Sequence, residues 1–358
     1  MMCSMDHAER RRLLARRLDE LEVEALLVMR QVNVRYLTGF TGSNGQLLLS
    51  GEPVLFTDPR YDEQSSKEAP DLRREIYHRA FFEALSSAVQ EQGVRRMGFE
   101  RHDVTFETHE RLSGLEVDLV PVGPEVERLR WTKDPEEIGH LERAQEITDT
   151  AFELVVGKLA EGMTERDVAL ELELAMRREG AERVGFDTIA AFGENAAEPH
   201  HHPTDRGLGR GDLVKLDFGC VVEGYHSDMT RTVAFGEPGE ELREIYDLVA
   251  RAQEAGIGAV RAGVRGDAAD AAARSVIEKA GHGERFGHSL GHGVGLEIHE
   301  GPTLRRGSED VLPEHTVVTV EPGVYVPGTG GVRIEDAVVV TDGGCRPLPR
   351  APKELIVL

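Results

Sequence analysis

Two kinds of hydrophobic pattern alternate along the first third of the chain. Apolar residues recur at helical spacing over residues 7–21 and 81–92, and Asp58–Tyr61 has the composition of a helix start. Short apolar runs bounded by turn residues predict strands, at residues 24–29, 46–50, 53–57, 96–100 and 116–122. This alternation predicts a separate α/β domain over residues 1–128.

Glycines gather between the first two predicted strands, in residues 36–45 (YLTGFTGSNG), and we expect this segment to form a loop. No Lys-Ser or Lys-Thr pair follows the glycines, and no helix pattern starts directly after them. The segment therefore lacks the features that a phosphate-binding loop requires.

Long helical patterns open the second part of the chain. After a polar connector, Arg130–Asp134, the pattern predicts a helix over residues 136–159, with Asp134 as its cap and Pro135 in its first turn. Thr164 is placed to cap the next helix. Further helices are predicted, over residues 165–179, about 240–262 and 267–280.

Extended patterns fill the rest of this part. They cover residues 187–192, 212–219 and 229–235, and the carboxy-terminal tail is rich in strand patterns. The second and third of these runs predict a hairpin that turns around Gly224. Helices grouped around strands in this order predict an α+β domain with a mainly antiparallel sheet over residues 129–358.

The predicted hairpin places two aspartates in apolar surroundings, Asp217 near the end of the first strand and Asp228 just before the second. Side chains that oppose one another on neighbouring strands, on the same face, can reach one metal ion. Burying an unpaired carboxylate is costly, which favours a shared cation. The ordinary alternative is two exposed aspartates at strand ends.

Composition narrows the possible classes of protein. The 358 residues carry a formal net charge of -23 and the arginines are scattered, which disfavours nucleic acid as a partner. Without a signal-peptide pattern or an uninterrupted apolar run of about 18 residues, we expect a cytoplasmic protein that does not enter a membrane. The three cysteines, Cys3, Cys220 and Cys345, form no C-x-x-C pair and indicate neither a disulfide framework nor a thiolate zinc site.

Three further segments place potential ligands in apolar or glycine-rich runs. GHSLGHGVGLEIHE carries His288, His292 and His299, Glu321 follows TVVTV, and Glu335 lies inside VRIEDAVVV. Each residue has an ordinary alternative. A histidine among glycines is commonly a hydrogen-bond partner within a loop, and a glutamate beside charged neighbours can be a paired surface residue.

The conjunction of these residues suggests a metal site. Asp217, Asp228, Glu321 and Glu335 with a single histidine make four negative charges, which two divalent cations would balance. An oxygen-rich set with one imidazole suits Mn²⁺, Fe²⁺, Co²⁺ or Zn²⁺, and two such ions can activate water and polarise a carbonyl. The expected chemistry is hydrolysis.

The motifs DFG, SDMTR, GHGVG, TVEPGVY and GVRIED, in this order, closely resemble those of the pita-bread metallopeptidases, which include aminopeptidase P, prolidase and methionine aminopeptidase. The resemblance extends to the amino-terminal domain. It implies a pita-bread catalytic domain and two divalent metal ions, with Mn²⁺ favoured over Co²⁺ or Zn²⁺. The implied ligands are Asp217, Asp228, His292, Glu321 and Glu335.

The same resemblance implies catalytic roles for residues around the ligands. His288 and His299 match histidines that bind substrate and stabilise the tetrahedral intermediate, and spacing from Asp217 assigns a third such role to His200. The neighbours His201 and His202 depart from the family pattern, and the sequence assigns them no role.

Two further assignments follow from the resemblance. Arg333 matches an arginine that orients the last glutamate ligand or the substrate. Glu321 matches a glutamate that also shuttles a proton from the attacking water to the leaving amine.

Within the family, TGFTGSNG and FTDPRY are more similar to aminopeptidase P, which implies removal of an amino-terminal residue from peptides with proline at the second position. Prolidase, which cleaves only Xaa-Pro dipeptides, is the alternative. A pita-bread domain kept as a non-catalytic binding module is a remote alternative that predicts lost ligands. Methionine aminopeptidases generally lack a first domain of this size, and creatinase works without the metal ligands. The resemblance also implies a homodimer or larger homo-oligomer.

Overall fold

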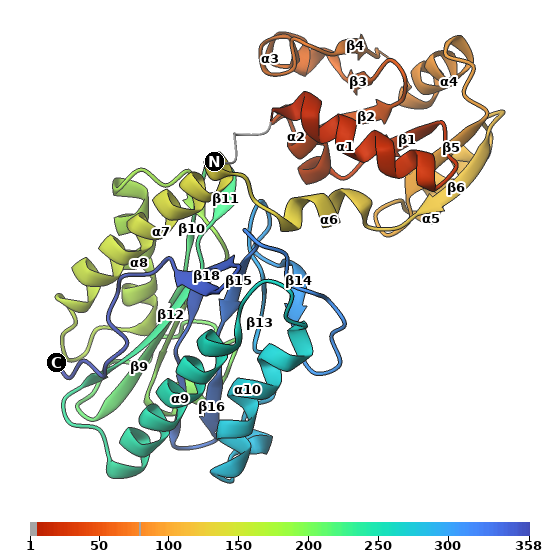
Figure 1. The fold of residues 1–358 in the computed structure, drawn as a ribbon. Helices are drawn as coiled ribbons and strands as arrows, with labels where there is room; N and C mark the ends of the chain where they lie inside the picture. The colour runs from red at the N-terminus through yellow and green to blue at the C-terminus, as the bar shows by residue number, and fades with distance from the viewer. Residues whose placement is uncertain (1–5, 79) are drawn as a thin grey trace. The chain divides into compact units, whose positions relative to one another are not determined.

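The computed structural model describes residues 6–78 and 80–358, so Cys3 lies outside the described residues. The chain divides into two compact units, one of which reaches Arg130 while the other begins at Trp131 (Figure 1). Separate clusters of buried apolar side chains form the core of each unit. In the described part of the chain, no helix is both long and apolar enough to span a bilayer.

The amino-terminal unit is a mixed sheet in the order β4-β3-β2-β1-β5-β6, with helices packed against it. Its strands are β1 (Ala25–Val28), β2 (Gly45–Leu49), β3 (Val54–Thr57), β4 (Arg73–Ile76), β5 (Arg96–Glu100) and β6 (Asp118–Val122). Its helices are α1 (His7–Glu20), α2 (Gln31–Thr38), α3 (Asp62–Glu68), α4 (Phe81–Glu91), α5 (Phe106–Leu112) and α6 (Glu125–Trp131), with a 3-10 turn η1 (Pro59–Tyr61).

The predicted strands of this unit are present, but the loop predicted over residues 36–45 is wrong at its start. Residues 36–38 form the last turn of α2, and the loop begins at Gly39, whose φ of 79° ends the helix in the left-handed region. Helix α2 has 8 residues and α5 and α6 have 7 each, too few turns for a helical period to stand out.

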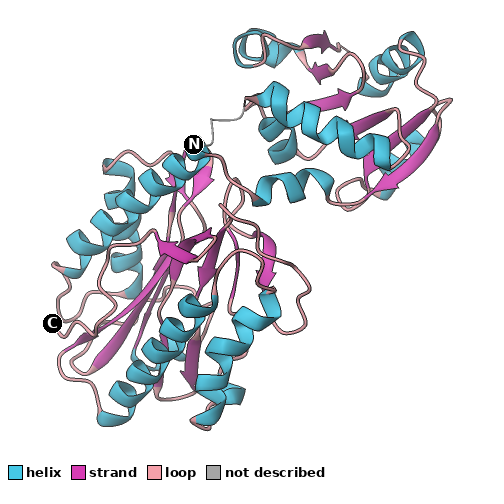
Figure 2. Ribbon diagram, viewed as in Figure 1, coloured by secondary structure: helices cyan, strands magenta, loops and turns pink. Residues whose placement is uncertain are grey.

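The carboxy-terminal unit combines four long helices with antiparallel strands, as Figure 2 shows. The helices are α7 (Pro135–Val156), α8 (Glu165–Arg178), α9 (Glu240–Ala259) and α10 (Gly266–Lys279), with 3-10 turns η2 (Gly193–Ala197) and η3 (Gly283–Arg285). The first half contributes strands β7 (Arg183–Val184), β8 (Ile189–Phe192), β9 (Asp212–Phe218), β10 (Cys220–Val222), β11 (Tyr225–His226) and β12 (Met229–Phe235). The second half contributes β13 (Gly291–Gly293), β14 (Glu300–Leu304), β15 (Val317–Val320), β16 (Gly323–Val326), β17 (Gly330–Arg333), β18 (Asp336–Thr341) and β19 (Gly344–Pro347).

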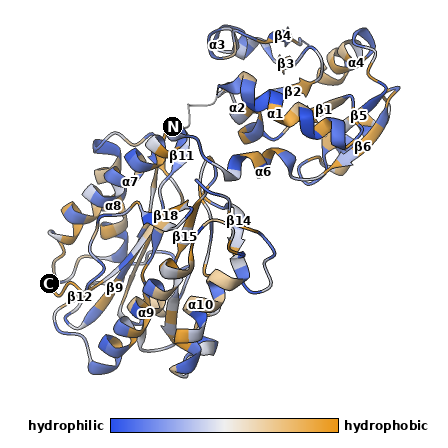
Figure 3. Cartoon of the chain, in the orientation of Figure 1, coloured by the Kyte–Doolittle hydropathy of each residue, from blue (hydrophilic) through white to orange (hydrophobic). Residues whose placement is uncertain are grey.

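Every strand pair in the described part of this unit is antiparallel, which agrees with the predicted α+β class. The strands lie in the orders β12-β9-β8, β14-β13-β15-β18-β19, β16-β17 and β11-β10-β7. One core joins α7 and α8 to β8, β9 and β12, and a second joins α9 and α10 to the strands of the second half. In Figure 3 these helices carry both hydrophilic and hydrophobic residues, as expected for helices with one buried face.

The predicted helix starts of this unit are confirmed. Asp134 accepts hydrogen bonds from the backbone of Glu136 and Glu137 at the start of α7, and Thr164 caps α8 in the same way. Both form capping boxes, which satisfy amide groups that the first helical turn leaves unpaired.

A buried arginine ties β12 to the end of the chain. Arg231 is 1% exposed, and its guanidinium pairs with Asp336 at 2.8 Å. It also donates to the backbone carbonyls of Ala351, at 2.9 Å, and of Pro352, at 3.1 Å. Because a buried charge is costly without partners, this network is a main constraint on how the second half packs on β12.

The first prediction concerns this network. Arg231→Met keeps much of the side-chain volume but removes the donors, so that the Ala351 carbonyl and one Asp336 oxygen lose their partner. We expect the free energy of unfolding of this unit to fall by about 3 kcal/mol or more. Urea denaturation followed by the fluorescence of Trp131, the single tryptophan of the chain, measures the change.

Arg346→Met is the matched control, because Arg346 pairs with Glu142 at 2.7 Å in an ion pair whose side chains are 53% and 44% exposed. An exposed pair contributes less than about 1 kcal/mol. Equal destabilisation by the two variants would contradict the special weight given to Arg231.

Candidate metal centre

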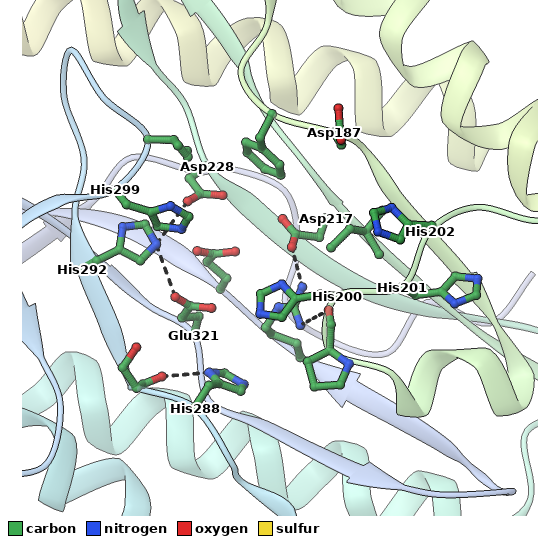
Figure 4. A pocket seen from close by; sticks show the side chains of 17 residues that line it. Asp187, His200, His201, His202, Asp217, Asp228, His288, His292, His299 and Glu321 are labelled. Carbon is green, nitrogen blue, oxygen red and sulfur yellow. Dashed lines mark hydrogen bonds and ion pairs between the residues drawn. The ribbon is translucent and has the colours of Figure 1, made fainter. Parts of the chain in front are cut away.

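A pocket of about 520 Å³ opens in the carboxy-terminal unit (Figure 4). Its walls come from both halves of the unit, and apolar side chains such as Phe186, Ile189 and Ile298 line part of it. The structure brings every residue that the sequence singled out into this pocket, namely His200, Asp217, Asp228, His288, His292, His299, Glu321, Arg333 and Glu335.

The hairpin that carries the two aspartates forms as predicted, with an elaborated tip. In the β9–β12 ladder Asp217 lies opposite Thr230, and Asp228 directly precedes β12. Between them the short strands β10 and β11 extend the turn, which passes through Gly224 at a φ of 81°. At Gly219 an added Cβ would lie 2.0 Å from the Ser227 carbonyl oxygen, so only glycine permits this close approach.

The remaining candidate ligands come from the second half of the unit. His292 lies in β13, Glu321 follows β15, and Glu335 lies between β17 and β18. His292 Nε2 is 3.6 Å from Asp228 Oδ2 and 3.4 Å from Glu321 Oε1. One ligand atom from each of Asp228, His292 and Glu335 lies within 4.8 Å of the others, a spacing that could hold a metal ion.

The electrostatics of this cluster favour a cation. Burial, and then the charge of Glu335, raises the pKa of Asp228 well above its ordinary value. Burial and the same neighbour act on Glu321 in the same direction. For Glu335 itself, burial and then Asp217 raise the pKa to about 8. Carboxylates packed this closely can all be ionised only when positive charge lies among them.

Two further observations show that the donor set fits divalent cations. Asp217 Oδ1 is buried without a hydrogen-bond partner among the described residues, which leaves it open as a ligand. His292 is 3.0 Å from the Gly293 carbonyl through Nδ1, and burial, followed by the charge of His299, lowers its pKa to about 4. A neutral ring that donates from Nδ1 presents the lone pair of Nε2 to a metal ion.

Arg333 is the buried cation of the pocket, and it contacts Asp217 rather than Glu335. Its Nη2 pairs with Asp217 Oδ2, its Nε donates to Thr230 Oγ1 at 3.0 Å, and its Nη1 donates to Tyr325 Oη at 2.8 Å. Glu335 is instead oriented by Thr230, whose hydroxyl donates to it at 2.7 Å. The arginine therefore holds the first aspartate of the cluster in place.

The three predicted catalytic histidines have different surroundings. His288 donates from Nδ1 to the Ser289 carbonyl at 2.8 Å and lies 2.9 Å from Tyr325 Oη through Nε2, so both ring nitrogens are engaged. Burial, and then the charge of Arg333, lowers its pKa to about 3. The His299 ring packs edge-on against His292 with centroids 4.3 Å apart. His200 lines the pocket from the loop after η2.

Sequence reasoning missed the residues that orient these groups. Thr230, Thr319 and Tyr325 lie inside the quoted motifs SDMTR and TVEPGVY but were assigned no role. Thr319 Oγ1 accepts from the His292 backbone at 3.1 Å and donates to Glu321 Oε1 at 3.3 Å. The signal that could have found them is their spacing: Thr230 and Thr319 lie two residues from a ligand, which on a strand places them on the same face.

Comparison with known proteins agrees with this geometry. Residues 139–342 match the model of metallopeptidase family M24, and residues 10–132 match that of the creatinase/prolidase amino-terminal domain. The chain belongs to metallopeptidase family M24. The resemblance inferred from the motifs is thus confirmed, as is the pita-bread fold preceded by a smaller α/β domain.

Relatives of this M24 metallopeptidase match it over nearly their whole length. The solved structure of a Xaa-Pro dipeptidase from Bacillus anthracis is 40% identical, with a TM-score of 0.96 over 99% of this chain and 100% of its own. An X-Pro aminopeptidase from Thermotoga maritima is 38% identical, with a TM-score of 0.89 over 96% of this chain and 100% of its own. A Xaa-Pro dipeptidase from Pyrococcus horikoshii is 36% identical over 95% of this chain and 96% of its own.

The pKa of Glu335 generates the second prediction. Without a cation, a raised pKa means that the folded state binds this proton more tightly than the unfolded chain does. The metal-free M24 metallopeptidase should therefore lose stability as pH rises from the ordinary glutamate value of about 4.5 towards about 8. Thermal denaturation in chelator between pH 5 and pH 8 measures this loss.

Added Mn²⁺ should stabilise the protein increasingly over the same interval, because the ligands must be ionised to bind it. Glu335→Gln should flatten the pH dependence of the metal-free protein. A melting temperature that does not change with pH in chelator would contradict the prediction.

Proposed function

We propose that this M24 metallopeptidase is a Xaa-Pro dipeptidase, which hydrolyses the bond between an amino-terminal residue and a carboxy-terminal proline. The observation that carries the proposal is the match to the Bacillus anthracis Xaa-Pro dipeptidase, with a TM-score of 0.96 over 99% of this chain. The pocket supports it, because the candidate ligands and histidines converge there.

Aminopeptidase P activity is the second candidate. The sequence motifs alone favour it, and the Thermotoga maritima X-Pro aminopeptidase supports it with a TM-score of 0.89. We place the dipeptidase first because Xaa-Pro dipeptidases occur among both the structural neighbours and the sequence relatives.

We propose that Asp217, Asp228, His292, Glu321 and Glu335 hold two divalent cations, with Mn²⁺ preferred and Co²⁺ or Zn²⁺ as alternatives. The set is rich in oxygen and has one imidazole, which suits these ions. When bound, the cations would polarise the scissile carbonyl and make a water molecule acidic enough to attack at neutral pH.

The protein groups around the cluster divide the remaining work. Glu321 takes the proton of the attacking water on its carboxylate and gives it to the proline nitrogen that leaves. His200 and His299 face the same pocket and stabilise the oxyanion. Since both ring nitrogens of His288 are engaged within the protein, its part is to hold Tyr325, which accepts from Arg333.

The pocket can select proline because the proline nitrogen lacks an amide hydrogen when it forms a peptide bond. The amide nitrogen of a Xaa-Pro bond carries no N–H. A pocket without a hydrogen-bond acceptor beside this nitrogen therefore leaves no donor of the substrate unsatisfied. Phe186, Ile189 and Ile298 supply apolar wall for a pyrrolidine ring. A substrate with an ordinary amide would bury an unsatisfied donor against such a wall.

The third prediction separates the two candidates by substrate length. A Xaa-Pro dipeptide should be cleaved with a kcat/KM at least about tenfold higher than the matching Xaa-Pro-Xaa tripeptide, a difference of about 1.4 kcal/mol in transition-state binding. Chromatography of the free amino acids released from each peptide measures the two rates. Preferential cleavage of the tripeptide would instead identify an aminopeptidase P.

The fourth prediction concerns the metal. Chelation should abolish cleavage, and restoring Mn²⁺, Co²⁺ or Zn²⁺ should return it. Asp228→Asn should lower kcat by about a hundredfold or more while the circular dichroism spectrum stays unchanged. Asp205→Asn is the matched control, because Asp205 is an exposed carboxylate paired with Arg166 at the surface. Normal turnover by Asp228→Asn would remove this residue from the ligand set.

A further inference from the structure

Three consecutive histidines in the loop after η2 have different surroundings. All three line the pocket, but Figure 4 shows the His201 ring pointing away from Asp228, His292 and Glu321. The His201 side chain is 5% exposed and is held at both ring nitrogens. Nε2 lies 2.8 Å from Glu165 Oε2, and Nδ1 lies 2.7 Å from Glu198 Oε2. A histidine with no role in the sequence pattern is thus the one that anchors the loop.

Glu165, the first residue of α8, is the centre of this anchor. Its side chain is fully buried, and it accepts hydrogen bonds from residues before, within and after the three histidines. Oε1 accepts from the Phe192 backbone at 2.8 Å and from Asn195 Nδ2 at 2.9 Å. Oε2 accepts from the Thr204 backbone at 2.9 Å, its hydroxyl at 2.6 Å, and the ring of His201.

The hydrogen bonds suffice to keep Glu165 ionised in its buried position. Burial opposes ionisation, but the bonds from Thr204 and His201 outweigh it and lower the pKa of the carboxyl below its ordinary value. Burying a carboxylate is costly unless hydrogen-bond donors satisfy it. Because two of these donors, His201 and Thr204, belong to the loop, the bonds to Glu165 also hold the loop in place.

Two buried basic side chains hold the backbone just before His200. Lys215, on the same face of β9 as Asp217, is fully buried and donates from Nζ to the carbonyls of Ala196, at 3.0 Å, and Glu198, at 2.5 Å. Arg333 Nη1 donates to the Pro199 carbonyl at 3.2 Å. The backbone immediately before His200 is therefore fixed by groups that belong to the candidate metal centre or adjoin it.

The ring of His200 has no such support of its own. Among the residues that the structure describes, none makes a hydrogen bond with it, although it lines the pocket. Its position in the pocket must come from its backbone, which Lys215 and Arg333 hold just before His200 and which His201, bound to Glu165, holds just after it.

We propose that His201 and Glu165 are positioning residues. They hold the His200 ring at the place in the pocket from which it can stabilise the oxyanion. The inference rests on the proposed function and deepens it. A loop displaced by about 1 Å can cost a reaction about a hundredfold in rate, because a donor aimed at the transition state loses its alignment. Substrate binding in the ground state depends much less on this donor.

The central test compares His201→Ala with His201→Gln on a Xaa-Pro dipeptide. His201→Ala should lower kcat about 10- to 100-fold with KM within about twofold of the wild type. His201→Gln, whose amide can still donate to Glu165, should keep kcat within about threefold. Elemental analysis should find the wild-type metal content in both variants. A rise in KM alone, or loss of metal, would overturn the positioning role.

A double-mutant cycle asks whether His201 acts through His200. In a His200→Ala background, His201→Ala should change kcat by less than about twofold, since the donor it positions is already gone. Effects that multiply in full would show that the two residues act independently and would overturn the proposal.

A spectroscopic measurement covers the case of low activity. In protein labelled with ¹⁵N-histidine, the His200 ring signal, identified by its loss in His200→Ala, should shift or broaden in His201→Ala and keep its position in His201→Gln. An unchanged His200 signal in His201→Ala contradicts the positioning role. If wild-type enzyme with restored metal cleaves neither Xaa-Pro peptide, the proposed function fails, whereas this signal still tests the loop by itself.

Discussion

Repulsion among carboxylates is the constraint on which the carboxy-terminal unit depends. Asp217, Asp228, Glu321 and Glu335 converge on one pocket, and all but Glu321 are buried, which would be costly for a lone carboxylate. Arg333 pairs with Asp217, and threonine hydroxyls donate to Glu321 and Glu335. The remaining oxygen and nitrogen atoms of the cluster suit divalent cations. The charge that strains the metal-free fold is thus the charge that the proposed cations would balance.

The arrangement of the unit in two halves follows from the same constraint. The aspartates lie in β9 and just before β12, which pack with α7 and α8. His292, Glu321 and Glu335 lie in or beside strands that pack with α9 and α10. Neither half has a complete set of ligands. The backbone bond from Glu335 to the Thr230 carbonyl, at 3.1 Å, joins the halves at the site itself. The candidate ligands therefore come together only when both cores are in place.

Local chemistry made much of this predictable from sequence. Helix starts at Asp134 and Thr164, the turn at Gly224 and the hairpin of Asp217 and Asp228 depend on neighbouring residues, and the structure has each of them. What the sequence missed depends on partners far along the chain. The residues next to His201 in the sequence do not indicate its hydrogen bond to Glu165. Those next to Arg333 do not indicate its ion pair with Asp217. Short helices such as α2 were not predicted, because a hydrophobic period cannot be recognised over eight residues.

The Arg231 network also makes the burial of β12 depend on residues that are translated much later. Two of its acceptors, Ala351 and Pro352, follow Arg231 by 120 and 121 positions. A growing chain that has already paired β12 with β9 therefore cannot yet place the Arg231 guanidinium against these two carbonyls. The β-ladder that presents Asp217 can form early, but its burial is completed only by residues made late. Burial of Arg231 is thus coupled to residues more than a hundred positions further along the chain, and a chain that stops before Ala351 would lack these two acceptors.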